Sequence, residues 1–157
     1  IQIDTVTSTY VNKNKPFAFG MNAKGTLNNA ITFSNDKMIS LSIDKLIQHN
    51  QLKSNTESSE LNYYLDYSYS DNFLFYLNFP CNIDVLGIEN STIDFKNETG
   101  EYYFKIKKSK DNQLLFHSKY KIKENLIPKE NYNQLKQLNE QVKKVKSKRL
   151  IIKLIKE

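Results

Sequence analysis

Apolar and polar residues alternate along most of the stretch from residue 61 to residue 79. The segment ESSELNYYLDYSYSD carries apolar or aromatic side chains at every second position: Leu61, Tyr63, Leu65, Tyr67 and Tyr69. The polar residues SDN at 70–72 follow, and FLFYLNF then alternates with four apolar residues on one side: Phe73, Phe75, Leu77 and Phe79. Period-two alternation is typical of a strand with one buried face. We therefore predict a hairpin with its turn at 70–72, ending at Pro80, because proline cannot donate to a ladder.

A second hairpin is predicted from residue 101 to residue 122. EYYFKIKKS and LLFHSKYKI alternate on either side of the turn sequence KDNQ, with these residues inward: Tyr102, Phe104, Ile106, Leu114, Phe116, Tyr120 and Ile122. The opposite face carries several lysines, and lysine on a solvent-facing strand protects a sheet against pairing with another chain. NIDVLG and STIDFKN are shorter candidate strands. In the first sixty residues the runs IQIDTVTSTYV, FAFGMNA and AITFS suggest strands, and KMISLSI alternates. IDKLIQHN suggests a short helical turn, and KSNTESSE a polar loop.

The apolar spacing changes to a helical period near residue 128. Five apolar residues step by three or four positions and form a single stripe: Tyr132, Leu135, Leu138, Val142 and Val145. Pro128 suits the first turn of a helix, and Lys143, Lys144 and Lys146 complement the dipole of the last turn. The other faces carry charged residues such as Lys129, Lys136, Glu140 and Lys144. This pattern predicts an amphipathic helix at about 128–145 that packs across a sheet.

The chain closes with a strongly apolar run, RLIIKLI. Leu150, Ile152 and Leu154 have one parity and Ile151 and Ile155 the other, which predicts a strand covered on both faces and running beneath the helix. Taken together, the elements predict a mainly β fold: an antiparallel, sandwich-like domain with one C-terminal helix and a final buried strand. With 157 residues the chain is long enough for a single domain, 1–157, with its own core.

Composition narrows the functional classes. No apolar run is long enough to cross a membrane as a helix, so no membrane insertion is expected. IQIDTVTSTY has no signal-peptide features, and we interpret Ile1 as the start of a piece of a longer parent protein. The net charge of +6 is uneven, since residues 118–157 contain 12 Lys or Arg and 4 Glu. That tail is compatible with nucleic-acid binding, but interspersed glutamates and the helix's buried stripe favour a solvated basic face, so no nucleic-acid partner is expected.

Catalytic and cofactor motifs are not evident. Cys81 with His49 or His117 could form a nucleophile and base, but Cys81 follows Pro80 at a strand end, with no helix start to activate it. Two histidines and one cysteine without short spacing do not make a metal motif, and no glycine-rich phosphate loop is present. We expect no enzyme activity and no cofactor. Tyr64 and Tyr103 fall on the polar faces of their strands, so they are candidates to line a glycan or peptide groove.

The order of motifs resembles a known bacterial domain. Two segments with a lysine-rich strand between them carry the resemblance: NFPCNIDVLGIENSTIDFKNETGEYYFKI and LIPKENYNQLKQLNEQVKKVKSKRLII. They are similar to the C-terminal β-domain of exported transglutaminase-like proteins. Pro128, Tyr132, Leu135 and the last strand occur in that order. The resemblance covers residues 39–157 and leaves 1–38 unassigned. It implies an upstream catalytic core in the parent, a periplasmic or cell-surface location, and a non-catalytic accessory domain here that contacts the parent's upstream domains. The alternative is a stand-alone module that binds glycan or peptide.

Overall fold

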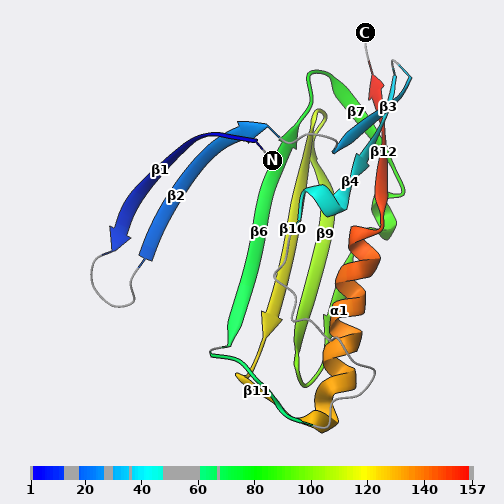
Figure 1. Cartoon of the computed structure of the whole chain (residues 1–157). Helices are drawn as coiled ribbons and strands as arrows, with labels where there is room; N and C mark the ends of the chain where they lie inside the picture. Colours follow the sequence, from blue (N-terminus) through cyan, green and yellow to red (C-terminus); the bar gives the residue numbers. More distant parts are fainter. Residues whose placement is uncertain are drawn as a thin grey trace.

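The computed structural model describes residues 2–12, 18–26, 30–35, 37–47, 61–66 and 68–155. It confirms a mainly β chain with antiparallel sheets, one C-terminal helix and a final strand (Figure 1). Within these residues no helix is long and apolar enough to cross a membrane. The polar loop predicted at 53–60 lies outside the described residues.

Four long strands form one antiparallel sheet, which we call sheet I. Its strands in spatial order are β6 (Tyr69–Asn78), β10 (Gln113–Ile122), β9 (Gly100–Lys110) and β8 (Ile93–Lys96). The second hairpin is thus confirmed, with its turn at Asp111 and Asn112 and with Tyr102, Phe104 and Phe116 buried. Strict alternation produces this arrangement, because every second side chain of a strand points to the same face.

A second sheet, sheet II, forms from shorter strands that lie far apart in the sequence. In spatial order these are β3 (Ile31–Asn35), β4 (Met38–Ser42), β12 (Arg149–Ile155) and β7 (Asn82–Leu86). The 3₁₀ turn η1 (Ile43–Lys45) follows β4, as the helical-turn pattern predicts. A second turn, η2 (Ile88–Asn90), follows β7 after Gly87, whose φ of 75° is the left-handed conformation that glycine adopts at no steric cost.

Two small antiparallel pairs complete the β structure. β5 (Tyr63–Tyr64) pairs with β11 (Leu126–Ile127). β1 (Gln2–Asn12) pairs with β2 (Ala18–Thr26) in a hairpin that projects away from both four-stranded sheets (Figure 1). The strands suggested for the first part of the chain are therefore present.

Helix α1 (Tyr132–Lys146) begins four residues later than predicted. Pro128 is extended, with ψ of 148°, and the 3₁₀ turn η3 (Lys129–Asn131) leads into the helix. The predicted stripe is confirmed, because all five of its residues are buried: Tyr132, Leu135, Leu138, Val142 and Val145. The helix packs against β9 and β8, where Asn97 Nδ2 donates a hydrogen bond of 2.8 Å to the Gln134 carbonyl.

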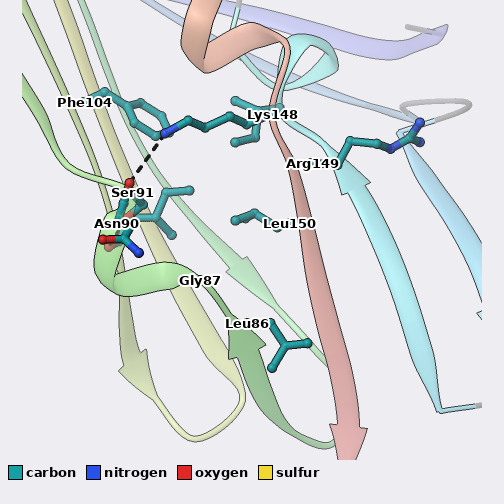
Figure 2. A pocket seen from close by; sticks show the side chains of 10 residues that line it. Leu86, Gly87, Asn90, Ser91, Phe104, Lys148, Arg149 and Leu150 are labelled. Atoms are coloured by element: carbon teal, nitrogen blue, oxygen red, sulfur yellow. Dashed lines mark hydrogen bonds between the residues drawn. The ribbon is translucent and has the colours of Figure 1, made fainter.

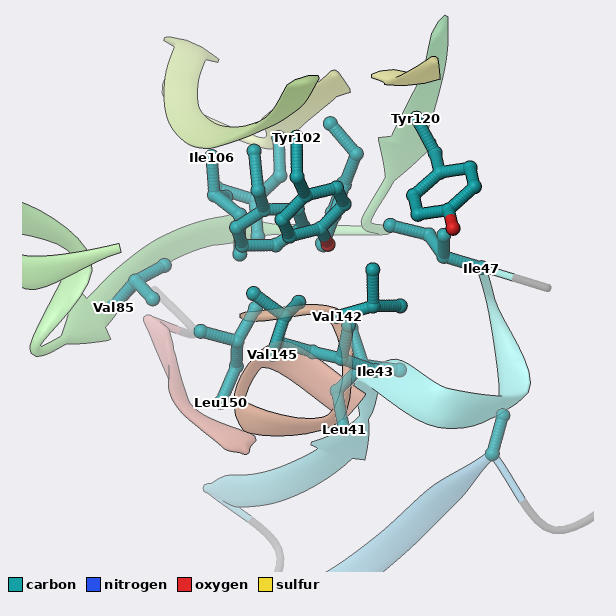
Figure 3. Packing of buried hydrophobic residues seen from close by; sticks show 14 of the residues in the cluster. Leu41, Ile43, Ile47, Val85, Tyr102, Ile106, Tyr120, Val142, Val145 and Leu150 are labelled. Atoms are coloured by element: carbon teal, nitrogen blue, oxygen red, sulfur yellow. The ribbon is translucent and has the colours of Figure 1, made fainter. Parts of the chain in front are cut away.

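The main core lies between two layers. Sheet I is one layer, and α1 together with sheet II forms the other. Figure 3 shows Tyr102 and Ile106 of sheet I facing Val142 and Val145 of the helix and Leu150 of β12. This two-layer packing is the sandwich-like arrangement that the sequence predicts, with the helix covering part of the face that a second sheet would otherwise cover.

The first predicted hairpin is wrong. No turn occurs at 70–72, because β6 runs without interruption through these residues and pairs with β10 from Tyr69 to Asn78. Residues 63–64 instead pair with β11. Polar residues do not break a strand when a ladder partner satisfies the backbone, and the partners of residues 70–72 lie about fifty residues away along the chain. The inward positions of FLFYLNF are as predicted, since Phe73, Phe75 and Leu77 pack against the core.

The final strand is confirmed, but its surroundings differ from the prediction. β12 continues from the end of α1 within the same layer and does not run beneath the helix (Figure 1). Leu150 and Ile152 are buried against the core, whereas Ile155 on the other face is 45% exposed. β12 lies between β4 and β7, so its backbone is paired on both edges while its outer face stays open. Backbone pairing on both edges, and not a cover on both faces, accounts for its position.

Candidate interaction surface

The outer face of sheet I, opposite the helix, carries an apolar patch among lysines. The register places Tyr76 beside Leu115, and Leu74 beside His117, across the β6–β10 ladder. Leu74 is 58% exposed and Tyr76 is 55% exposed. On a solvent-facing sheet, two large exposed apolar side chains on neighbouring outward positions are unusual, because outward positions are ordinarily polar.

A shallow pocket of about 170 Å³ lies next to this patch, lined by Leu74, Tyr103, Lys105, Lys107, Leu115 and His117. The Tyr103 and His117 rings meet edge to face with centroids 5.0 Å apart. His117 Nε2 also forms a hydrogen bond of 3.0 Å with Asn72 Oδ1, which holds the imidazole on the sheet. Tyr103 and His117 therefore form an aromatic floor of the pocket, and Lys105 and Lys107 form its cationic walls.

The charge around the pocket is mainly positive. Lys105 and Lys107 are exposed on β9 and take part in no salt bridge in the described part of the chain. Lys119 lies 3.8 Å from Glu101, so its charge is partly compensated. An apolar strip bordered by free ammonium groups can bind an extended chain that combines apolar and acidic side chains.

The structure separates the two tyrosines suggested as groove residues. Tyr103 lines the shallow pocket, whereas Tyr64 lies on β5, outside sheet I, and is 73% exposed. Tyr64 is not among the residues that line the pocket. The sequence prediction overlooked Leu74, Tyr76 and Leu115. The signal for the first two was present in FLFYL, where apolar residues occupy both parities of a strand.

A larger pocket of about 300 Å³ lies where β7, η2 and the start of β12 meet (Figure 2). Phe104, Ile106 and Leu150 line its inner side and are all buried. The Lys148 side chain crosses it, with Nζ 3.5 Å from the Asn90 carbonyl oxygen. Arg149 points away from it, toward Ser40 and Thr32 of sheet II. Because the apolar floor is already closed to water, this pocket offers a ligand little further burial, and the outer face of sheet I is the stronger candidate.

The residues considered for catalysis do not form a site in the described part of the chain. Cys81 is a half-exposed free thiol just before β7, and His117 lies within the outer face of sheet I, contacting Tyr103 and Asn72. His49 lies outside the described residues. Among residues 2–12, 18–26, 30–35, 37–47, 61–66 and 68–155, no group of three histidine, cysteine or acidic side chains could hold a metal ion.

Comparison with known proteins identifies a family. A family model described as a domain of unknown function with a solved structure (DUF3858) matches residues 36–152, well over half of the chain. The matched segment contains all of sheet I, the helix and most of sheet II. No curated protein and no solved structure matches the chain.

Proposed function

Because the chain belongs to the DUF3858 family, whose function is unknown, we propose from its surface that it is a non-catalytic interaction module of a larger exported protein. The parent would be transglutaminase-like or protease-like, with its catalytic core upstream and a periplasmic or cell-surface location. The observation that carries the interaction role is the exposed Leu74 and Tyr76 beside a pocket with lysine walls.

The motif order supports this type of parent. Pro128, Tyr132, Leu135 and a final aliphatic strand occur in the order found in the C-terminal β-domain of bacterial exported transglutaminase-like proteins. In this chain Tyr132 and Leu135 are buried and Pro128 precedes the helix, so these matching positions have structural roles. The coding sequence next to this segment tests the proposal. A transglutaminase-like core encoded directly upstream supports it, and an unrelated neighbour contradicts the proposed parent.

A purely binding role agrees with the placement of Cys81. This thiol is half-buried and belongs to no group of three or more histidine, cysteine or acidic side chains among the described residues. We expect the isolated chain to show no turnover of peptide or amide substrates, and Cys81→Ala to behave as the wild type. A turnover that disappears with Cys81→Ala would contradict the non-catalytic role.

The partner that best fits the outer face of sheet I is an extended polypeptide segment with alternating acidic and apolar residues, supplied by the parent's upstream domains or by another protein. Its apolar side chains would contact Leu74, Tyr76 and Leu115, and its carboxylates would approach Lys105 and Lys107. Charge complementarity of this kind increases association rate and specificity and weakens with salt.

Binding of a fluorescein-labelled peptide of alternating glutamate and leucine tests the partner class. We expect the double variant Lys105→Glu/Lys107→Glu to weaken binding about tenfold, or about 1.4 kcal/mol. Lys136→Glu on the exposed face of α1 is the matched control and should leave the affinity unchanged.

Two other probes cover the alternatives. A neutral oligosaccharide that binds more tightly than the peptide, and with no salt dependence, would favour the glycan-binding alternative. An oligonucleotide that binds tightly at raised salt would contradict the expectation of no nucleic-acid partner, because phosphate contacts alone weaken steeply with salt.

A further inference from the structure

β6 is a terminal strand of sheet I, and it is long and regular. It pairs with β10 over ten residues without a register shift, and no other strand in the described part of the chain pairs with its opposite edge. The Phe79 N–H donates a hydrogen bond of 2.9 Å to the Asn112 carbonyl at the end of this ladder. Since backbone groups alternate in direction along a strand, the odd-numbered residues of β6 face β10. The even-numbered residues direct their N–H and C=O groups to the open edge: Ser70, Asn72, Leu74, Tyr76 and Asn78.

The other terminal strands carry features that discourage pairing, and β6 does not. β8 has four residues and exposes Asp94 and Lys96. β7 has five residues with Asp84 exposed, and β3 has a register irregularity in its ladder with β4. β6 contains no lysine, no proline and no bulge, and its only charged residue is Asp71. A long edge of this kind is a template for pairing with another strand.

We infer that β6 pairs with β6 of a second copy of this chain, in antiparallel orientation about a two-fold axis at Leu74. The two four-stranded sheets then form one continuous eight-stranded sheet. Only even-numbered residues can bond across this edge, and the register that uses all of them pairs Leu74 with Leu74, Asn72 with Tyr76 and Ser70 with Asn78. A two-fold interface uses the same surface on both copies, so the strand must complement itself.

The side chains of β6 meet that requirement. On the outer face Leu74 contacts its own copy, and each Tyr76 lies beside an Asn72. On the inner face Phe73 lies opposite Phe75, and both are half-buried residues that pack against the core from one side. Asp71 lies opposite Leu77, so no like charges meet. The lysines of the outer face belong to β9 and β10, which keeps the positive charges of the two copies apart by two β6 strands.

This assembly is independent of the proposed ligand but affects its site. It places the Leu74 side chains of the two copies side by side, with one Tyr76 and one lysine-walled pocket on each side of the junction. A second copy is a better occupant than a foreign strand, because β6 has no charge pattern that would select one and its apolar residues match its own sequence.

Cysteine cross-linking tests the register directly. In a Cys81→Ser background, Leu74→Cys should form a covalent dimer under mild oxidation. Residues opposite each other at a hydrogen-bonded position are about 5.5 Å apart between Cα atoms, which is within the range of a disulfide. Ser70→Cys is the matched control on the same edge. Its two copies would lie about 27 Å apart, at about 3.4 Å for each of eight residues, and should not cross-link. Mixing Ser70→Cys with Asn78→Cys should produce a mixed dimer.

Light scattering during size-exclusion chromatography provides the second measurement. We expect the wild type to have twice the mass of the 18.4 kDa chain at high concentration. Leu74→Lys and, separately, Leu74→Pro should shift it to the monomer mass while circular dichroism stays unchanged. The proline removes only an N–H on the open edge, so the β10 ladder is kept.

A monomeric wild type at every concentration, or equal cross-linking by Leu74→Cys and Ser70→Cys, would overturn the inference. Neither outcome affects the peptide-binding test, which depends on Lys105 and Lys107.

Discussion

The Tyr120 hydroxyl donates a hydrogen bond of 2.9 Å to Asn139 Oδ1, and both side chains are buried between sheet I and α1. Asn139 lies at the edge of the apolar stripe of α1, where the helical spacing permits a polar residue. The bond therefore fixes how the helix is rotated on the sheet.

Removing one partner of this pair should destabilise the fold more than replacing both. We expect Tyr120→Phe and Asn139→Leu each to cost about 1–3 kcal/mol in unfolding free energy, because each removes this buried hydrogen bond. The double variant should cost less than the sum of the two. Urea unfolding of all four proteins measures this coupling. Strictly additive losses would show that the two groups do not interact.

Leu138 and Lys136 separate the buried and exposed faces of α1. Leu138→Ala should cost about 2–5 kcal/mol, the usual range for emptying a buried leucine site. Lys136→Ala should change stability by less than about 0.5 kcal/mol, because Lys136 is exposed. The urea unfolding midpoints of the two variants test this difference. Equal and small effects would mean that the helix does not contribute to the core.

Gly100 allows the helix and β10 to approach β9 closely. A Cβ at this position would collide with the Lys121 carbonyl oxygen and would lie 2.7 Å from Leu138 Cδ2. Gly100→Ala should therefore lower the unfolding free energy by about 1–3 kcal/mol through overpacking.

Gly87 is the matched control for Gly100. A Cβ there would meet nothing within 4 Å, and its left-handed φ of 75° is one that asparagine tolerates. Gly87→Asn should therefore cost clearly less than Gly100→Ala in thermal unfolding. A larger cost for Gly87→Asn than for Gly100→Ala would contradict the close contact at Gly100.

Tyr102 should make the protein less stable at alkaline pH. Burial raises the pKa of Tyr102 to about 12, against an ordinary value of 10.0, while a hydrogen bond from Ser118 acts in the opposite direction. Between these two values the folded state holds a proton that the unfolded state has lost, so stability is full below pH 10 and falls as the pH rises toward 12. The loss amounts to at most about 2–3 kcal/mol.

Unfolding free energies at pH 9 and pH 11.5 test this dependence. Tyr102→Phe should show a correspondingly smaller alkaline loss than the wild type. An identical pH dependence in the two proteins would exclude Tyr102 as the cause.

Local periodicity alone determined most individual elements of this protein. The alternation in EYYFKIKKS and LLFHSKYKI predicted the β9–β10 hairpin and its buried residues, and the stripe from Tyr132 to Val145 predicted the buried face of α1. These predictions succeed because the direction of a side chain follows from the geometry of a strand or helix, without reference to distant residues.

Only the tertiary structure decided which strands pair and which apolar residues remain exposed. The polar residues 70–72 resemble a turn in sequence, yet β10 supplies backbone partners that keep them within β6. β12 pairs with β4 and β7, which lie more than sixty residues away, and Arg149 at its start pairs with Ser42. The alternation in FLFYL places Leu74 and Tyr76 on the face opposite Phe73 and Phe75, but only the assembled sheet shows that this face stays uncovered. A strand's hydrogen bonds are made with other segments, so its partners, its edges and its exposed face are properties of the assembled sheet.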